Sequence, residues 1–167
     1  IQADLKVSNQ TLEERPDMLL MSGDQIYADH VAGPMLDAIH QVCDFLGLQK
    51  EQFFAAPIEN SQELFAHPHC YYQRDKLLPS YNDDSHWLNR FLLPKHTPVF
   101  SSRECENHLI TFSEFVAMYL LVWSPALWRS ININRLEEQG FTHGGQAFSA
   151  VTIKHWRAEK TQIEQFV

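Results

Sequence analysis

Residues 111–123 read TFSEFVAMYLLVW, and this stretch decides the fold. Thr111 followed three positions later by Glu114 is a capping-box pattern, in which both side chains satisfy the first backbone N–H groups of a helix. The residues that follow are apolar almost all round, which is typical of a helix buried on most of its surface. The pattern therefore predicts a central helix that ends at Ser124-Pro125, because proline cannot continue it.

Helical patterns flank this segment on both sides. Gly33-Pro34 begins a helix whose apolar residues recur at helical spacing until Gly47 ends it. Further helices are expected over 62–65, over 71–78, over 84–91, from Pro125 to near Gly140, and from Gly144-Gly145 to about Phe166. The predicted class is mainly α: five to six helices with one short N-terminal strand, in a single mostly helical domain over 1–167.

The strand is predicted over 17–22, where an apolar run stops at Gly23. A lone strand leaves its backbone N–H and C=O groups without partners. We therefore expect that the rest of a sheet lies outside this chain, that the segment is remodelled, or that it pairs in a homo-oligomer. Ile1 stands where an initiator methionine would, so the chain is expected to be a piece of a longer protein.

The composition of the chain argues against some classes of binding partner. The chain has 13 basic and 21 acidic residues, a net charge of −8 with no basic cluster, which argues against a nucleic acid or an anionic membrane as partner. No signal peptide is visible, and no apolar stretch reaches the roughly 18 residues of a membrane span, so localisation stays open. Three cysteines are an odd, sparse set, which favours thiols over a disulfide framework.

Residues 23–29 read GDQIYAD and carry the clearest chemistry. Gly23 permits a tight turn, after which Asp24 projects from the carboxyl end of the strand, where open α/β sheets place ligands. The carboxylate of Asp24 and the phenol of Tyr27 are hard oxygen ligands for a divalent or trivalent cation. The alternative is a turn in which Asp24 accepts hydrogen bonds from nearby backbone.

This motif resembles the G-D-x-x-Y-A-D segment of PhoD-like alkaline phosphatases and phosphodiesterases, in the calcineurin-like metallophosphoesterase superfamily; purple acid phosphatases carry a related segment. Residues 72–79 and 111–127 resemble the helical segment that follows the motif in PhoD-like proteins. The resemblance implies that Asp24 bridges two metal ions, that Tyr27 binds the ferric one, and that Asp29 holds the loop from the second shell. It implies a dinuclear or multinuclear centre of iron with calcium or another divalent ion.

The implied activity is hydrolysis of phosphate esters by the longer protein, with this chain as a helical portion excised from an α/β metallophosphoesterase. The resembled enzymes take further ligands from an upstream strand, a downstream Asp-Asp-His-type segment and later histidines, none of which we identify in this chain. We therefore expect the chain alone to hold no metal centre and to be inactive. The alternative is a non-catalytic helical domain with a structural or interaction role.

Weaker candidates are weighed against simpler interpretations. His67, His69, Cys105 and His108 could supply four ligands to a tetrahedral zinc ion, but exposed loop histidines and a buried thiol are the favoured interpretation. Cys43 reads as core, and Cys105 near His108 lacks a recognisable oxyanion hole. The basic residues are interpreted as solvated rather than phosphate-binding: Arg74, Lys76, Arg90 and Lys95. Gly144-Gly145 is interpreted as a flexible turn, and the aromatic residues as core.

Overall fold

The computed structural model describes residues 7–18, 20, 22–54, 56–77 and 105–166. The mainly α class is confirmed. The α-helices are α2 (Gly33–Leu46), α3 (Ser61–Ala66), α5 (Phe112–Trp123), α6 (Pro125–Trp128), α7 (Arg135–Glu138) and α8 (Ala150–Phe166). Two 3-10 turns, η1 (Leu12–Glu14) and η2 (Arg74–Leu77), and a hairpin of β1 (Thr142–His143) and β2 (Gln146–Ala147) complete the described elements.

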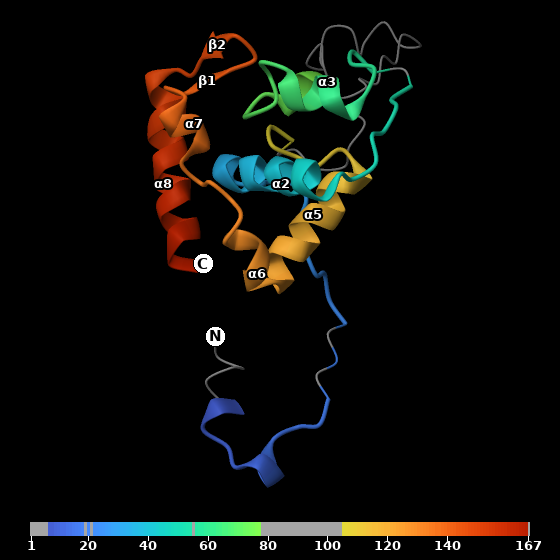
Figure 1. Cartoon of the computed structure of the whole chain (residues 1–167), viewed down its shortest axis with the longest axis vertical. Coiled ribbons are helices and arrows are strands. Elements are labelled where there is room, and N and C mark those ends of the chain that lie inside the picture. Colours follow the sequence, from blue (N-terminus) through green and yellow to red (C-terminus); the bar gives the residue numbers. More distant parts are fainter. Residues whose placement is uncertain (1–6, 19, 21, 55, 78–104, 167) are drawn as a thin grey trace, which may run out of the picture.

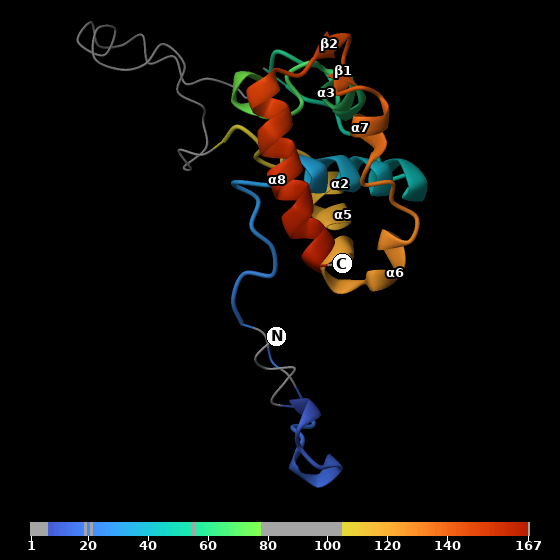
Figure 2. The same ribbon diagram turned by 90° about the vertical axis from the view of Figure 1, so that its left-hand side faces the viewer.

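Helix α2 lies at the centre of the helical body, where it packs against both α5 and α8 (Figures 1 and 2). Its residues are buried from Gly33 to His40 and again at Val42 and Cys43. Pro34 stands in the first turn, and Gly47 ends the helix with a φ of 61° while its N–H donates to the carbonyls of Asp44 and Cys43. These are the boundaries that the sequence predicts, because both punctuating residues act through local backbone geometry.

Helix α5 begins with the predicted capping box. Thr111 Oγ1 accepts a hydrogen bond from the Glu114 N–H, and Glu114 Oε2 accepts one from the Thr111 N–H, each at 3.0 Å. The expectation that α5 is buried almost all round is wrong. Only Ser113, Glu114, Ala117 and Leu121 are buried, whereas Phe112 is 74% exposed. Helix α2 covers one side of α5 and leaves a face with Tyr119 and Trp123 in contact with solvent.

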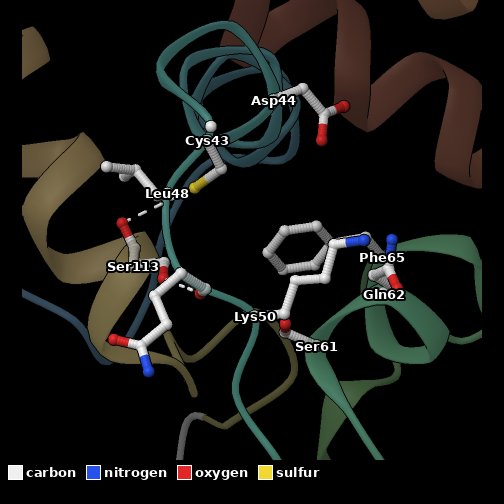
Figure 3. Close-up of a pocket in the computed structure, with 10 residues that line it drawn as sticks. Cys43, Asp44, Leu48, Lys50, Ser61, Gln62, Phe65 and Ser113 are labelled. Atoms are coloured by element: carbon white, nitrogen blue, oxygen red, sulfur yellow. Dashed lines mark hydrogen bonds between the residues drawn. The ribbon is translucent and has the colours of Figure 1, made fainter.

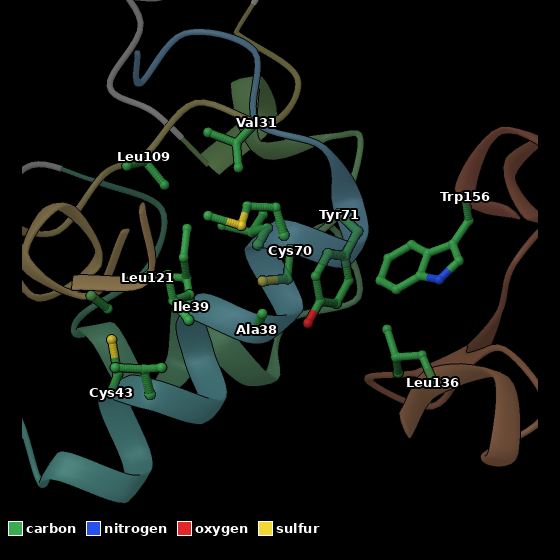
Figure 4. Close-up of a cluster of buried hydrophobic side chains, with 14 of the residues drawn as sticks. Val31, Ala38, Ile39, Cys43, Cys70, Tyr71, Leu109, Leu121, Leu136 and Trp156 are labelled. Carbon is green, nitrogen blue, oxygen red and sulfur yellow. The ribbon is translucent and has the colours of Figure 1, made fainter. Parts of the chain in front are cut away.

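Trp156 belongs to the C-terminal helix α8 and packs into the hydrophobic core. Its side chain is fully buried and meets the ring of Tyr71 edge-on at 5.5 Å, as Figure 4 shows. The rings of Phe141 and Phe148 also surround it, at 6.5 and 5.8 Å between centroids. Aromatic rings therefore join the last helix to the segment around Tyr71, far away in sequence.

The two-glycine segment forms the turn of the β1–β2 hairpin. Gly144 and Gly145 have φ values of 54° and 77°, and the flanking pairs are Thr142 with Ala147 and His143 with Gln146. Two successive residues with positive φ are typical of a two-residue hairpin turn. A Cβ at Gly144 would lie 2.6 Å from the Pro68 nitrogen, so the turn packs tightly against the body. Helix α8 starts after this hairpin, at Ala150.

The predicted strand over 17–22 is not formed by the residues of that segment that the structure describes, which are 17, 18, 20 and 22. Met18 and Leu20 are 80% and 82% exposed. The described part of residues 7–27 leads away from the helical body as an arm, which we call the N-terminal arm (Figures 1 and 2). A strand needs a neighbour to hydrogen bond, and no strand pairing or bridge involves the described residues 17, 18, 20 and 22.

Two other helix predictions need revision. The helix expected over 71–78 is only the 3-10 turn η2, because Tyr72 takes a φ of 59° that no α-helix allows. The helix expected from Pro125 to near Gly140 is divided into α6 and α7. The segment over 84–91 lies outside the described residues. Within the described ranges, no helix has the length and apolar character needed to cross a membrane.

Candidate functional site

The segment over residues 23–29, which we call the ligand loop, leaves its two predicted metal ligands open to solvent. Asp24 is exposed and Tyr27 is 72% exposed. The Gln25 side-chain amide donates to the Gly23 carbonyl at 2.8 Å, a local bond that folds the loop upon itself. Gly23 does not have a positive φ, and a Cβ there would meet no atom within 4 Å. The expected tight turn that requires glycine is therefore absent at this position.

The C-terminal end of the ligand loop is attached to residues 105–109, which we call the anchor segment. The Leu109 N–H donates to the Ala28 carbonyl at 2.9 Å, and His30 forms a parallel bridge with Asn107. Asp29 Oδ1 lies 3.3 Å from His108 Nε2. The carboxylate of Asp29, the last residue of the ligand loop, thus lies against the body at His108.

Arg74 lies behind the anchor segment and is fully buried. Its backbone N–H donates to the Glu106 carbonyl at 2.9 Å, and its Nη1 donates to the His108 carbonyl at 2.8 Å. Its Nη2 lies 2.5 Å from Glu114 Oε1. The interpretation of Arg74 as a solvated residue is therefore wrong: the guanidinium fixes the anchor segment against α5. Lys76 is exposed as expected, and Arg90 and Lys95 lie outside the described residues.

Glu114 accepts from His40 as well as from Arg74. His40 Nε2 lies 2.8 Å from Glu114 Oε1, and the His40 ring stacks on Phe65 at 4.0 Å. Burial alone would raise the pKa of Glu114, but the charge of Arg74 and the bond from His40 hold it well below its usual range. Burial lowers the pKa of His40, and the opposing effect of Glu114 does not restore it. A neutral His40 therefore faces an ionised Glu114.

A second buried pair joins this cluster. Asp37 forms an ion pair with Arg135 and accepts from the Tyr71 hydroxyl at 3.0 Å. The Tyr71 oxygen also lies 3.4 Å from His40 Nδ1, which links the two halves into one network. Burial, followed by the charge of Asp37, raises the pKa of Tyr71 well above its ordinary value. We call this set the buried polar network: Asp37, His40, Tyr71, Arg74, Glu114 and Arg135.

The buried polar network is too enclosed to act on a substrate, since all its members except Arg135 are buried. It connects α2, α5, α7 and the segment around Arg74 through buried polar contacts, although the Nε of Arg74 has no hydrogen-bond partner among the described residues. The sequence analysis did not identify it. One signal was available in the sequence: Asp37 and His40 lie three positions apart among the apolar residues of α2. Both are on the buried face of that helix.

The four candidate zinc ligands are not brought into one site. The His69 N–H donates to His67 Nδ1 at 3.0 Å, and the two rings lie 5.2 Å apart. Cys105 and His108 belong to the anchor segment, where His108 contacts Asp29. Across the part of the chain that the structure describes, no three residues among His, Cys, Asp and Glu are grouped so that they could hold a metal ion.

The cysteines are buried thiols, as the sequence predicts for Cys43. Cys43, Cys70 and Cys105 are 5%, 0% and 2% exposed. Burial raises the pKa of Cys43 and of Cys70 to about 12, and it raises the pKa of Cys105 as well. A nucleophilic cysteine requires the opposite shift, because the thiolate is the reactive form. The structure therefore provides no support for Cys–His catalysis.

A pocket of about 290 Å³ lies between the C-terminal end of α2 and the start of α3. Cys43 and Ser113 lie across from Phe65 in this pocket (Figure 3). The hydroxyls in its wall are already used: Ser113 Oγ donates to the Gln49 carbonyl at 2.8 Å, and Ser61 Oγ accepts from the Glu51 N–H at 3.1 Å. Because these groups bond to the protein itself, the pocket is a weaker candidate site than the ligand loop.

Comparisons of the chain with models of protein families, with curated proteins and with solved structures found no match.

Proposed function

We propose that this chain carries part of the metal site of a PhoD-like, metal-dependent phosphoric ester hydrolase. The observation that carries the proposal is the joint exposure of Asp24 and Tyr27 on the ligand loop. Two hard oxygen donors three residues apart, free to meet a cation, are the fragment of a site that the GDQIYAD motif implies. The fixed attachment of the loop at Ala28 supports the same interpretation, since ligands need a rigid support.

In this proposal Asp24 bridges two cations and Tyr27 binds the trivalent one, iron paired with calcium or another divalent ion. Bound there, the metal centre supplies positive charge that attracts a phosphate ester to an otherwise acidic protein. Asp29 keeps the loop in place, and the helical body forms a wall beside the site. Two ligands cannot hold a dinuclear centre, so the remaining ligands come from other parts of the longer protein and the chain alone is inactive.

Ferric ion binding tests the role of Tyr27 directly. A tyrosinate bound to iron(III) produces a visible charge-transfer absorption, so we expect this absorption when the longer protein that contains this chain is loaded with iron(III). The Tyr27→Phe variant is expected to lack it. Tyr119→Phe is the matched control, because Tyr119 is another exposed tyrosine, 46% exposed, outside the motif. Equal absorption from Tyr27→Phe and the unaltered protein would refute the assignment.

Catalysis is tested in the longer protein that contains this chain. The Asp24→Asn variant keeps the size of the side chain but removes its charge, and it is expected to lower both metal content and the hydrolysis of a chromogenic phosphodiester. Normal metal content and turnover in that variant would contradict the proposal. The chain by itself, supplied with iron, calcium, manganese or zinc, is expected to hydrolyse none of the same diester.

A non-catalytic interaction domain is the second candidate, favoured by the N-terminal arm. Leu12, Met18 and Leu20 are each at least 80% exposed, and apolar side chains exposed in this way often mark a contact surface. In this case the arm is expected to associate with a second copy. Light scattering after size-exclusion chromatography measures the mass, and Leu20→Asp is expected to convert a dimer into a monomer. A monomeric unaltered chain at all concentrations would remove this candidate.

A further inference from the structure

The end of the ligand loop depends on one partner whose position is fixed independently. His108 is 6% exposed, while the Asp29 side chain that it contacts is 62% exposed. The His108 ring is held by its Nδ1, which donates to the Leu109 carbonyl, and its backbone carbonyl accepts from Arg74. Arg74 is in turn fixed by Glu114 of α5. The exposed carboxylate thus rests on a histidine that the core holds rigidly.

The anchor segment is fixed from the opposite side as well. Asn107 is fully buried, and its Oδ1 accepts from the Tyr72 N–H at 2.6 Å. Tyr72 has a φ of 59°, a conformation that costs energy for a residue other than glycine and persists only where its surroundings impose it. The Tyr72 hydroxyl donates to Glu159 of α8 at 2.5 Å. Contacts from α5 and α8 therefore converge on Asn107 and His108.

From this arrangement we infer that His108 is a positioning residue for the ligand loop, acting on it through Asp29. The Ala28 carbonyl and the His30–Asn107 bridge fix the path of the loop backbone, and His108 holds the carboxylate of Asp29, the last residue of the loop. The role of the Asp29–His108 contact in positioning metal ligands rests on the proposed function, but the contact itself does not.

Amide hydrogen exchange of the metal-free chain tests the inference. The Leu109 N–H bonds to the Ala28 carbonyl, so its exchange reports the loosening of the loop. His108→Asn keeps a donor close to the place of Nδ1 but ends short of Asp29, and it is expected to speed this exchange about three- to fivefold, as loss of one partly exposed polar contact would. His108→Gln carries an amide out to the place of Nε2 and is expected to exchange as the unaltered chain does.

Asp29→Ala removes the same contact from the exposed side, where the substitution does not endanger folding. It is expected to give the same increase as His108→Asn, and the double variant no further increase, because both substitutions remove one interaction. Amides of α2 and α5 are expected to exchange at the normal rate in every variant. An unchanged Leu109 rate in Asp29→Ala, or an equal increase in His108→Gln and His108→Asn, would overturn the inference.

Iron(III) binding separates this inference from the proposed function. In the longer protein, the Tyr27-dependent absorption is expected to need about three- to fivefold more iron(III) citrate in His108→Asn than in His108→Gln. A longer protein that gives no Tyr27-dependent absorption contradicts the proposed function, while the exchange rates of the chain still decide whether His108 positions the loop.

Discussion

Arg74 and Glu114 form an ion pair of 2.5 Å in which neither side chain has any exposed surface. The same carboxylate accepts from His40 at 2.8 Å and from the backbone N–H groups of Ile110 and Thr111 at 2.8 and 3.0 Å. One glutamate therefore caps α5, neutralises a buried guanidinium and connects α5 to α2. These hydrogen bonds replace the water that the carboxylate loses on burial. Each donor would in turn be left without a partner if the carboxylate were removed.

Glu114→Gln is expected to lower the free energy of unfolding by about 3–5 kcal/mol, because it leaves the Arg74 charge buried without a counter-ion. Glu137→Gln is the matched control. Glu137 pairs with Arg157 and Lys160 at the surface, each at 2.9 Å, so its loss is expected to cost less than about 1 kcal/mol. Urea denaturation measures both. Equal destabilisation by the two substitutions would show that burial of the Arg74–Glu114 pair has no special cost.

The folded chain is expected to lose stability as the pH falls below about 6.5, and His40 causes part of this loss. Because burial lowers the pKa of His40 below its ordinary value of 6.5, the unfolded chain binds more protons than the folded one. The contribution of His40 is therefore complete above pH 6.5 and is lost as the pH falls. Glu114, whose pKa is lowered from 4.5, adds a loss of the same sign only below about pH 4.5.

The His40→Gln variant isolates this effect, since glutamine still donates to Glu114 but does not titrate. Between about pH 7 and pH 5 it is expected to lose less stability in urea denaturation than the unaltered chain. His67 and His143, whose pKa values are also lowered by burial, are present in both proteins and cancel in the comparison. Parallel stability curves for the two proteins would contradict a pKa of His40 that is lowered on folding.

Two glycines offer a matched test of packing. A Cβ at Gly33 would lie 2.3 Å from the Tyr72 hydroxyl oxygen and 2.8 Å from Trp156 Cε3, whereas a Cβ at Gly23 would meet nothing. Gly33→Ala is expected to cost about 1–3 kcal/mol because α2 or its neighbours must shift. Gly23→Ala is expected to change stability by less than about 0.5 kcal/mol. Thermal unfolding followed by circular dichroism distinguishes them, and a neutral Gly33→Ala would contradict the close contact with Tyr72.

The cysteines provide a test of core integrity. All three are buried and have raised pKa values, so a thiol reagent such as Ellman's is expected to label none of them rapidly in the folded chain. Three equivalents are expected to react after denaturation in urea. Rapid labelling of one thiol in the folded chain, assigned by mass spectrometry, would mean that the residues that bury this thiol open locally.

The helix boundaries that could be predicted are those set by neighbouring residues. Gly33-Pro34, Gly47 and the Thr111–Glu114 capping box act within one turn of the backbone, and each lies where its pattern indicates. The strand over 17–22 was predicted from apolar character alone. A strand is a relationship between two segments, so its formation depends on a partner that the pattern does not specify.

The candidate site also combines features that depend on local spacing with contacts between residues far apart in the sequence. The assignment of Asp24, Tyr27 and Asp29 to a metal site rests on their local spacing in the motif, and it stays a prediction. The partnership of Asp29 with His108 crosses about 80 residues of sequence and has no local signal. Arg74 was misinterpreted for the same reason: its burial depends on Glu114, which is 40 positions away.

Glu159 of α8 accepts a hydrogen bond from the Gly33 N–H at 2.9 Å, 126 positions earlier in the chain. The first turn of α2 is therefore completed by a residue close to the C-terminal end of the sequence. During synthesis α2 leaves the ribosome long before Glu159 is made, so the part of its surface that α8 covers stays exposed over that interval even after α5 has formed. Contacts of such long sequence separation slow folding, and we expect the nascent chain to need protection over this interval.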